Sequence, residues 1–226
     1  MLRAVIFDFD GVVTDSEILH FRAFNEILRN FGFELTKQEY YGTYLGMTDM
    51  DCYKALIGEG RLGIDVEQVP QLVEKKNVVF EKLAREEGQI IDGVRDFLEM
   101  LRENRVPTAI CSGALLSEIE MILRQSDLRD YFGAIIAADH ISNGKPDPEG
   151  FLLTLERLNK EGNQGIKGHE CVVIEDSHWG IEAARAAGMR VVAVTNTYGA
   201  DELTSADAVV ANLTELGISN LREICE

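Results

Sequence analysis

The stretch Ala4-Val5-Ile6-Phe7-Asp8-Phe9-Asp10-Gly11 contains the first apolar run of the chain, residues 4–9, and the acidic residues Asp8 and Asp10 stand at its end. Five further runs rich in Val, Ile and Ala follow at 107–111, 134–138, 171–174, 191–194 and 208–211. None alternates apolar with polar residues, which is typical of strands covered on both faces of a parallel sheet. Amphipathic, helix-period segments lie between the runs. This order predicts an α/β fold built on a doubly wound parallel sheet.

Residues 16–88 interrupt the alternation, because they contain helix signals and no convincing strand. The signals for four helix starts are Ser16 or Asp15, the capping box Thr36-Lys37-Gln38-Glu39, Thr48, and the first-turn proline Pro70. The first helix should turn an apolar face from Ile18 to Phe31 and end at Gly32, the third should end near Gly58, and the fourth should reach Glu87. We therefore predict a helical cap domain, residues 16–88, inserted into an α/β core of residues 1–15 and 89–226.

The charge and cysteine content of the chain argue against several classes of binding partner and structural site. The 226 residues hold 22 Lys and Arg against 39 Asp and Glu, a net charge of −17. Such an excess opposes nonspecific binding to nucleic acid or to an anionic membrane, where cationic patches supply most of the affinity. The four cysteines are spread along the chain without a Cys-x-x-Cys pair, so neither a zinc site nor a disulfide framework is indicated. With no signal peptide or membrane-length apolar run, we expect a reduced, cytoplasmic protein. The sequence does not determine the oligomeric state, for which we favour a monomer.

Polar residues that could act in binding or catalysis follow four of the predicted strands in turn. They are Asp8 and Asp10 after the first, Ser112 and Gly113 after the second, Lys145 after the third, and Glu175 and Asp176 after the fourth. In a parallel sheet the carboxyl ends of the strands share one edge, and ligands of doubly wound folds bind there. The sequence therefore predicts that these groups converge on one site.

The residue types suit phosphoryl chemistry. The carboxylates of Asp8, Glu175 and Asp176 are hard oxygen donors that suit Mg²⁺, and their mutual repulsion calls for a cation. Lys145, the Ser112 hydroxyl and backbone N–H groups near Gly113 at a helix start suit a phosphate. Asp8 could attack phosphorus to give an aspartyl-phosphate. Two residues further on, Asp10 could act as general acid and then as general base.

A receiver-like module, in which a phosphorylated Asp switches a partner surface, would use the same groups. The helical insertion argues against a receiver, because a cap adds a substrate chamber that a switch does not need.

Four segments, in order, resemble the motifs of the haloacid dehalogenase superfamily of phosphohydrolases. They are Phe7-Asp8-Phe9-Asp10-Gly11-Val12-Val13-Thr14-Asp15-Ser16-Glu17, Cys111-Ser112-Gly113, Gly144-Lys145-Pro146-Asp147-Pro148, and Val173-Ile174-Glu175-Asp176-Ser177 with the following Gly180-Ile181-Glu182-Ala183-Ala184. The resemblance implies a Rossmann-like core with a helical cap. It also implies Mg²⁺ held by the Asp8 carboxylate, the Asp10 backbone carbonyl and Asp176, with Glu175 as a ligand or a more distant support.

Within that superfamily the chain is most similar to the β-phosphoglucomutase and sugar-phosphate phosphatase branch. Asp15-Ser16-Glu17 and His20 stand as that branch has them, and Lys75-Lys76-Asn77 resembles its cap segment for substrate. The resemblance thus implies substrate-binding roles for Lys76 and Asn77. For His20, which lies near the hinge of the cap, it allows a role in cap closure, and a structural role among apolar neighbours is the alternative. The mutases carry basic residues in the cap loop, whereas this loop reads Tyr44-Leu45-Gly46-Met47-Thr48-Asp49 and has no cation. We therefore expect a phosphatase acting on a small phosphorylated metabolite, with a sugar-phosphate mutase as the alternative.

Overall fold

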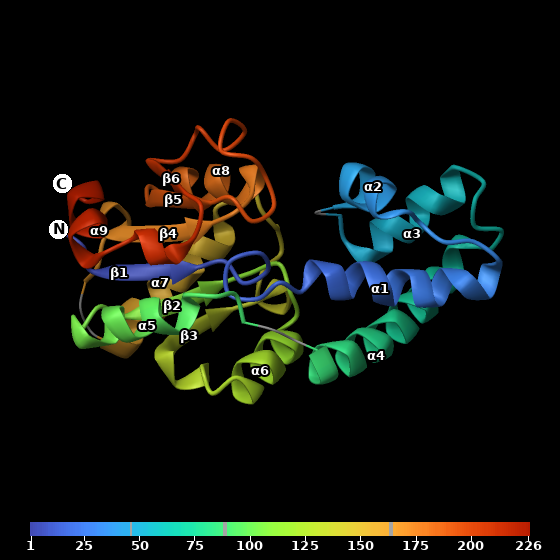
Figure 1. Ribbon diagram of the computed structural model, residues 1–226, viewed down its shortest axis with the longest axis horizontal. Helices are drawn as coiled ribbons and strands as arrows, with labels where there is room; N and C mark the ends of the chain where they lie inside the picture. The colour runs from blue at the N-terminus through green and yellow to red at the C-terminus, as the bar shows by residue number, and fades with distance from the viewer. Residues whose placement is uncertain (46, 88–89, 163–164) are drawn as a thin grey trace. The chain divides into compact units, whose positions relative to one another are not determined.

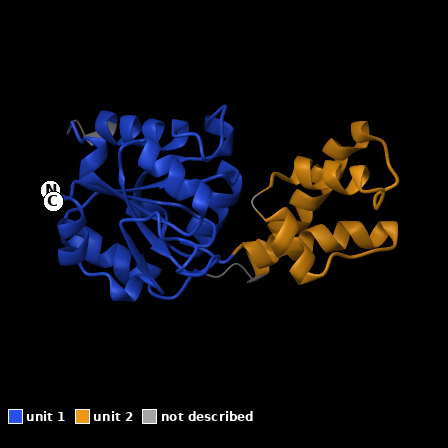
Figure 2. Ribbon diagram, turned by 90° about the horizontal axis from the view of Figure 1, so that it is seen from above, with its two compact units in different colours: residues 1–15, 89–226 blue, residues 16–88 orange. Residues whose placement is uncertain are grey.

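The computed structural model describes residues 1–45, 47–87, 90–162 and 165–226. The chain divides into two compact units, Met1–Asp15 with Gln89–Glu226 as unit 1, and Ser16–Gly88 as unit 2 (Figure 2). The second junction of the predicted cap, at residues 88 and 89, lies outside the described residues.

Unit 1 is built on one six-stranded sheet. The strands are β1 (Ala4–Phe7), β2 (Thr108–Cys111), β3 (Phe132–Ile136), β4 (Cys171–Glu175), β5 (Arg190–Val194) and β6 (Ala208–Val210). Their order is β3-β2-β1-β4-β5-β6, and every neighbouring pair is parallel. The order reverses at β1, which is the switch point of a doubly wound sheet. The predicted α/β fold is confirmed, and each predicted apolar run forms a strand shifted by one or two residues at its ends.

Helices pack against both faces of this sheet (Figure 1). They are α5 (Val94–Glu103), α6 (Leu116–Gln125), α7 (Glu149–Gly162), α8 (His178–Ala186) and α9 (Ile218–Ile224). On one face Ile6 is buried in a cluster with Phe151 of α7 and Ile181 of α8. On the other face the Phe7 ring meets Phe97 of α5 edge-on, with centroids 5.9 Å apart. Successive side chains of a strand point to opposite faces, so a strand covered on both sides is apolar throughout.

Unit 2 is helical. Its α-helices are α1 (Glu17–Leu28), α2 (Lys37–Glu39), α3 (Asp49–Gly58) and α4 (Val69–Glu87). Its core centres on Phe24 of α1, which stacks on Tyr53 of α3 with centroids 4.5 Å apart. The capping box at Thr36 and the Thr48 cap of α3 are confirmed, because each threonine side chain accepts the backbone N–H three residues on. Gly32 ends the first helical segment with φ +83°, the left-handed conformation that glycine favours.

Two details of the helical prediction were wrong. Ser16 stands at the N-cap of α1 but makes no side-chain cap hydrogen bond. Phe31 is 40% exposed, because α1 gives way to a 3₁₀ turn (Arg29–Phe31) that rotates it out of the apolar face. The capping box opens the second helix as predicted, with three residues of α-helix followed by the π-helix Tyr40–Tyr44.

Among the helices in the described part of the chain, none is at once long and apolar enough to span a membrane.

Candidate active site

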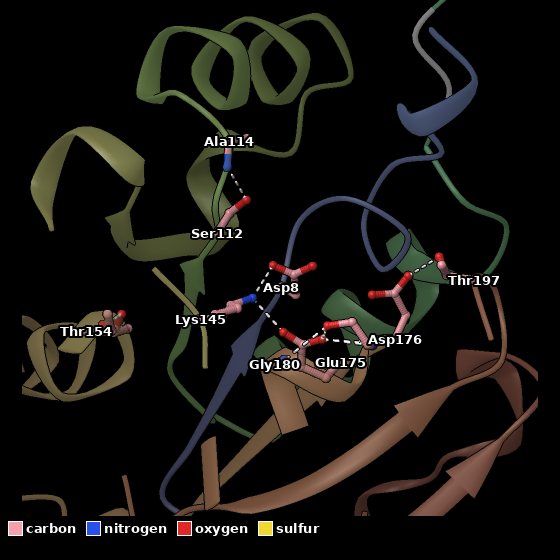
Figure 3. A network of polar contacts seen from close by, with 11 residues as sticks. Asp8, Ser112, Ala114, Lys145, Thr154, Glu175, Asp176, Gly180 and Thr197 are labelled. Atoms are coloured by element: carbon pink, nitrogen blue, oxygen red, sulfur yellow. Dashed lines mark hydrogen bonds and ion pairs between the residues drawn. The ribbon is translucent and has the colours of Figure 1, made fainter. Parts of the chain in front are cut away.

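Three buried carboxyl groups meet where the central strands of unit 1 end (Figure 3). Asp8 directly follows β1, Glu175 is the last residue of β4, and Asp176 directly follows β4. The two strands are paired in register, with the Asp8 backbone N–H donating to the Ile174 carbonyl at 2.9 Å. One carboxylate oxygen from each of the three residues lies within 4.8 Å of the others. Convergence at the carboxyl edge of the sheet follows directly from the parallel pairing.

Lys145 joins two of these carboxylates. Its Nζ donates to Asp8 Oδ1 at 2.6 Å and to Glu175 Oε1 at 2.5 Å. The lysine comes from the segment between β3 and α7, so a third part of the chain reaches the same site. Its side chain is only 17% exposed. Burial opposes the charge of the ammonium group, but Asp8 and Glu175 hold the pKa of Lys145 well above its ordinary value.

Both oxygens of Glu175 have partners. While Oε1 accepts from Lys145, Oε2 accepts the backbone N–H groups of Asp176 at 3.0 Å and Ser177 at 3.1 Å, and the Ser177 hydroxyl at 2.9 Å. Gly180, in the first turn of α8, leaves room for this carboxylate, since a Cβ there would lie 1.7 Å from Oε1. Glu175 therefore organises the loop between β4 and α8.

The site holds more negative charge than Lys145 offsets. Burial raises the pKa of Asp8 to about 7, Lys145 counteracts the rise, and the charges of Glu175 and Asp10 add to it. Burial, with Glu175 and Asp8 beside it, also raises the pKa of Asp176 well above its ordinary value. Clustered carboxylates with this surplus charge are typical of a cation site.

Asp10 and Ser112 flank this group. Asp10 is half-buried in the turn after β1, where its backbone bridges to Thr14. It lies outside the three-carboxylate group, although its charge reaches Asp8. Ser112 is buried at the end of β2, the strand beside β1, and its Oγ accepts the Ala114 N–H at 3.0 Å (Figure 3).

Gly113 does not stand at a helix start, contrary to the prediction. Helix α6 begins at Leu116, so the N–H groups near Gly113 belong to the loop that precedes it. Open space surrounds Gly113, with no heavy atom within 4 Å of a Cβ built there.

The candidate cap residues lie in unit 2. Lys76 of α4 is fully buried, and its Nζ lies 2.6 Å from His20 Nδ1 and 2.9 Å from Asp49 Oδ2. The His20 ring stacks on Phe80 at 3.9 Å, and burial together with the Lys76 charge holds the pKa of His20 well below its usual range. Asn77 follows Lys76 on α4 and is half-buried.

Two polar residues near Asp176 were missed. Thr197 and Asn196 follow β5, and the Thr197 hydroxyl donates to Asp176 Oδ2 (Figure 3). The Asn196 amide donates to the Gly11 carbonyl at 2.7 Å. The only signal for them in the sequence is their place after the fifth strand, because neither residue type is distinctive there by itself.

Aromatic side chains border the same loop. His178, the first residue of α8, packs against Tyr198 with ring centroids 4.6 Å apart. Trp179, the only tryptophan of the chain, is next on the helix and 52% exposed.

Comparison with known proteins gives a consistent result. Residues 2–188 match the family model described as haloacid dehalogenase-like hydrolase. A phosphorylated carbohydrates phosphatase of Thermotoga maritima is 33% identical over 99% of this chain and 100% of the relative. A fructose-1-phosphate phosphatase of Escherichia coli is 33% identical over 84% of this chain and 95% of the relative. The solved β-phosphoglucomutase of Clostridium difficile superimposes with a TM-score of 0.82 at 25% identity, covering 100% of this chain and 97% of that one.

Proposed function

The chain belongs to the haloacid dehalogenase-like hydrolases, and from that membership we propose that it is a Mg²⁺-dependent phosphatase of a small phosphorylated metabolite, a sugar phosphate in particular. It is a phosphoric monoester hydrolase of the branch that includes sugar-phosphate phosphatases and β-phosphoglucomutase. The observation that carries the proposal is the position of Lys145, whose ammonium group bridges Asp8 and Glu175 beside a third carboxylate.

The residues present fit a magnesium ion. Their donors are carboxylate oxygens, which Mg²⁺ prefers, and their surplus negative charge lacks a full counter-charge within the group. We assign the ion to Asp8 and Asp176, with the Asp10 backbone carbonyl that the family resemblance adds. Glu175 is proposed as a support, because both of its oxygens already accept hydrogen bonds. When bound, the ion offsets the repulsion between the carboxylates and an incoming phosphate.

Asp8 is the proposed nucleophile. A carboxylate oxygen of Asp8 bonds to phosphorus while the bond from phosphorus to the ester oxygen breaks, and Lys145, which donates to Oδ1, holds the carboxylate in place. Asp10 gives its proton to the departing alkoxide. Asp10, now a carboxylate, then takes a proton from water as the water oxygen bonds to phosphorus and the bond between phosphorus and Asp8 breaks. Phosphate leaves, and both carboxyl groups return to their starting states. Ser112 and Lys145 are proposed to bind the phosphate oxygens.

The cap favours hydrolysis over a mutase reaction. We propose that Asn77 helps to bind the sugar portion, and that the fully buried Lys76 and its neighbour His20 support this substrate-binding segment from within unit 2. Lys76 already has the Asp49 carboxylate as its counter-ion, so this buried cation is not available to grip a second phosphate. A mutase must retain a doubly phosphorylated intermediate. A sugar-phosphate mutase is the second candidate function, because this chain resembles a β-phosphoglucomutase.

We place the enzyme in the cytoplasm. All four cysteines are free and buried, which suits a reducing compartment.

A phosphate-release screen tests the proposal. Phosphorylated sugars, polyols and nucleotides are incubated with the protein, with and without Mg²⁺, and inorganic phosphate is measured. We expect Mg²⁺-dependent release from at least one sugar phosphate and none from the Asp8→Asn variant. Turnover that survives Asp8→Asn at a similar rate would end the proposed mechanism. Formation of the 6-phosphate from β-glucose 1-phosphate and a bisphosphate primer, without phosphate release, would favour the mutase.

A further inference from the structure

The segment after β5 touches both loops that carry the proposed metal ligands. Thr197 donates its hydroxyl proton to Asp176 Oδ2, on the loop after β4. Its neighbour Asn196 donates an amide proton to the carbonyl of Gly11 at 2.7 Å, in the turn after β1 that contains Asp10. Strand β5 pairs with β4, and β4 lies between β5 and β1. The segment after β5 therefore lies on one side of the site and contacts the loops after both β4 and β1.

Gly11 shows how closely these parts approach. Its φ is +77°, and a Cβ built there would lie 1.9 Å from Asp176 Oδ2 and 3.0 Å from Thr197 Oγ1. The turn after β1, the Asp176 carboxylate and the Thr197 hydroxyl thus meet at one point. A glycine is needed there both for its conformation and because the carboxylate occupies the space of a side chain.

The Asp176 carboxylate needs to be held in place. It is buried beside the negative charges of Glu175 and Asp8, which repel it. A hydrogen bond from a neutral hydroxyl fixes the rotation of the carboxylate without removing its charge. It occupies Oδ2 and leaves the second oxygen for an ion. Groups that orient metal ligands in this way commonly change metal affinity by about 10- to 100-fold when they are removed.

We propose that Thr197, supported by Asn196, is a positioning residue of the magnesium site, which holds Asp176 in the orientation that binds the ion. This inference rests on the proposed function. It assigns a role to the segment after β5, beyond the four motifs that carry the family resemblance.

Calorimetric titration of Mg²⁺ into the substrate-free protein tests the role directly. Thr197→Val removes the hydroxyl at nearly constant volume, and Thr197→Ser keeps it. Thr195→Val is the matched control, because Thr195 directly follows β5 and is half-buried like Thr197. We expect the Mg²⁺ dissociation constant to rise about 10- to 100-fold in Thr197→Val and to stay near wild type in Thr197→Ser and Thr195→Val. Asn196→Ala should weaken binding in the same direction.

Kinetics provide the second readout. The Mg²⁺ concentration for half-maximal phosphate release should rise in Thr197→Val, while kcat at saturating Mg²⁺ changes much less. A Thr197→Val protein that is folded by circular dichroism and binds Mg²⁺ as tightly as wild type would overturn the inference and leave the proposed function intact. Wild-type protein that neither binds Mg²⁺ nor needs it for turnover would overturn both.

Discussion

Glu175 is the residue on which the candidate site is organised, although it need not touch the ion. Its two oxygens accept four donors, from Lys145, from two backbone N–H groups and from the Ser177 hydroxyl. One carboxylate thereby orients the lysine beside Asp8 and shapes the loop that presents Asp176. The absence of a side chain at Gly180 is the condition for this arrangement.

Gly180→Ala should therefore damage the site through Glu175. The added methyl group would lie 1.7 Å from Oε1, so the carboxylate or α8 has to shift and its hydrogen bonds are lost. We expect phosphate release to fall at least about tenfold and the protein to lose about 1–3 kcal/mol of stability, the range for overpacked sites. Phosphate release and urea unfolding measure the two effects.

Gly58→Ala is the matched control for this substitution. Gly58 ends helix α3, and nothing lies within 4 Å of a Cβ built there. The stability and turnover of the Gly58→Ala protein should match those of wild type. Equal losses in Gly58→Ala and Gly180→Ala would contradict the steric account.

His20 should make the stability of the protein depend on pH. Burial and the Lys76 charge lower its pKa, so the folded protein resists protonation at a pH where an unfolded histidine, with a pKa of about 6.5, accepts a proton. Acidification below about pH 6.5 therefore favours the unfolded state, by up to about 1.4 kcal/mol per pH unit until the folded-state pKa is reached. The contribution of neutral His20 to the free energy of unfolding is therefore fully present at pH 7 and above, and it is lost as the pH falls below about 6.5.

Urea unfolding at several pH values measures this effect. The His20→Gln variant, which has no imidazole to titrate, should lose less stability on acidification than wild type does. A His20 ring resonance that titrates near pH 6.5 in the folded protein would contradict the prediction.

At the scale of elements, the apolar runs predicted the strands because a strand buried on both faces has no polar position. The same regularity located Asp8, Lys145 and the Glu175-Asp176 pair at one edge of the sheet. Contacts between helices were beyond this reasoning. Lys76 and Asp49 are 27 residues apart on two helices, and spacing along the chain says nothing about their distance in space. Thr197 escaped notice because a lone hydroxyl after a strand has no distinctive chemistry until its partner is known.

The ion pair between α3 and α4 should stabilise unit 2. Asp49→Ala would leave the fully buried Lys76 without its carboxylate, at a cost of about 3 kcal/mol. Urea unfolding of the variant measures the loss. The exposed pair of Arg29 and Glu34 is the matched control, and Glu34→Ala should leave the unfolding midpoint nearly unchanged. Equal midpoints for Asp49→Ala and wild type would show that the buried pair contributes little.

At the scale of the whole molecule, the proposed metal ligands all belong to unit 1. Mg²⁺ at about 100 times its dissociation constant should stabilise the state that binds it by about 2.7 kcal/mol. Hydrogen exchange with and without Mg²⁺ should therefore show slower exchange around β1 and β4, with less change in α3 and α4. Chelation of the metal should abolish phosphate release, and addition of Mg²⁺ should restore it.

Asp176→Asn is the control for that experiment, since it removes one charge from the ion site. Hydrogen exchange of the Asp176→Asn protein should change little when Mg²⁺ is added. Protection that rises equally in both units, or in the variant as in wild type, would mean that the ion acts elsewhere on this strongly acidic surface.

The solitary indole of the chain has a practical consequence. Trp179 lies in the first turn of α8, three residues beyond Asp176, and half of its surface faces water. Its fluorescence emission therefore comes from one known place, next to the loop that presents the carboxylate. Ion arrival and phosphate departure can be followed by stopped-flow changes in that emission, without attaching any dye.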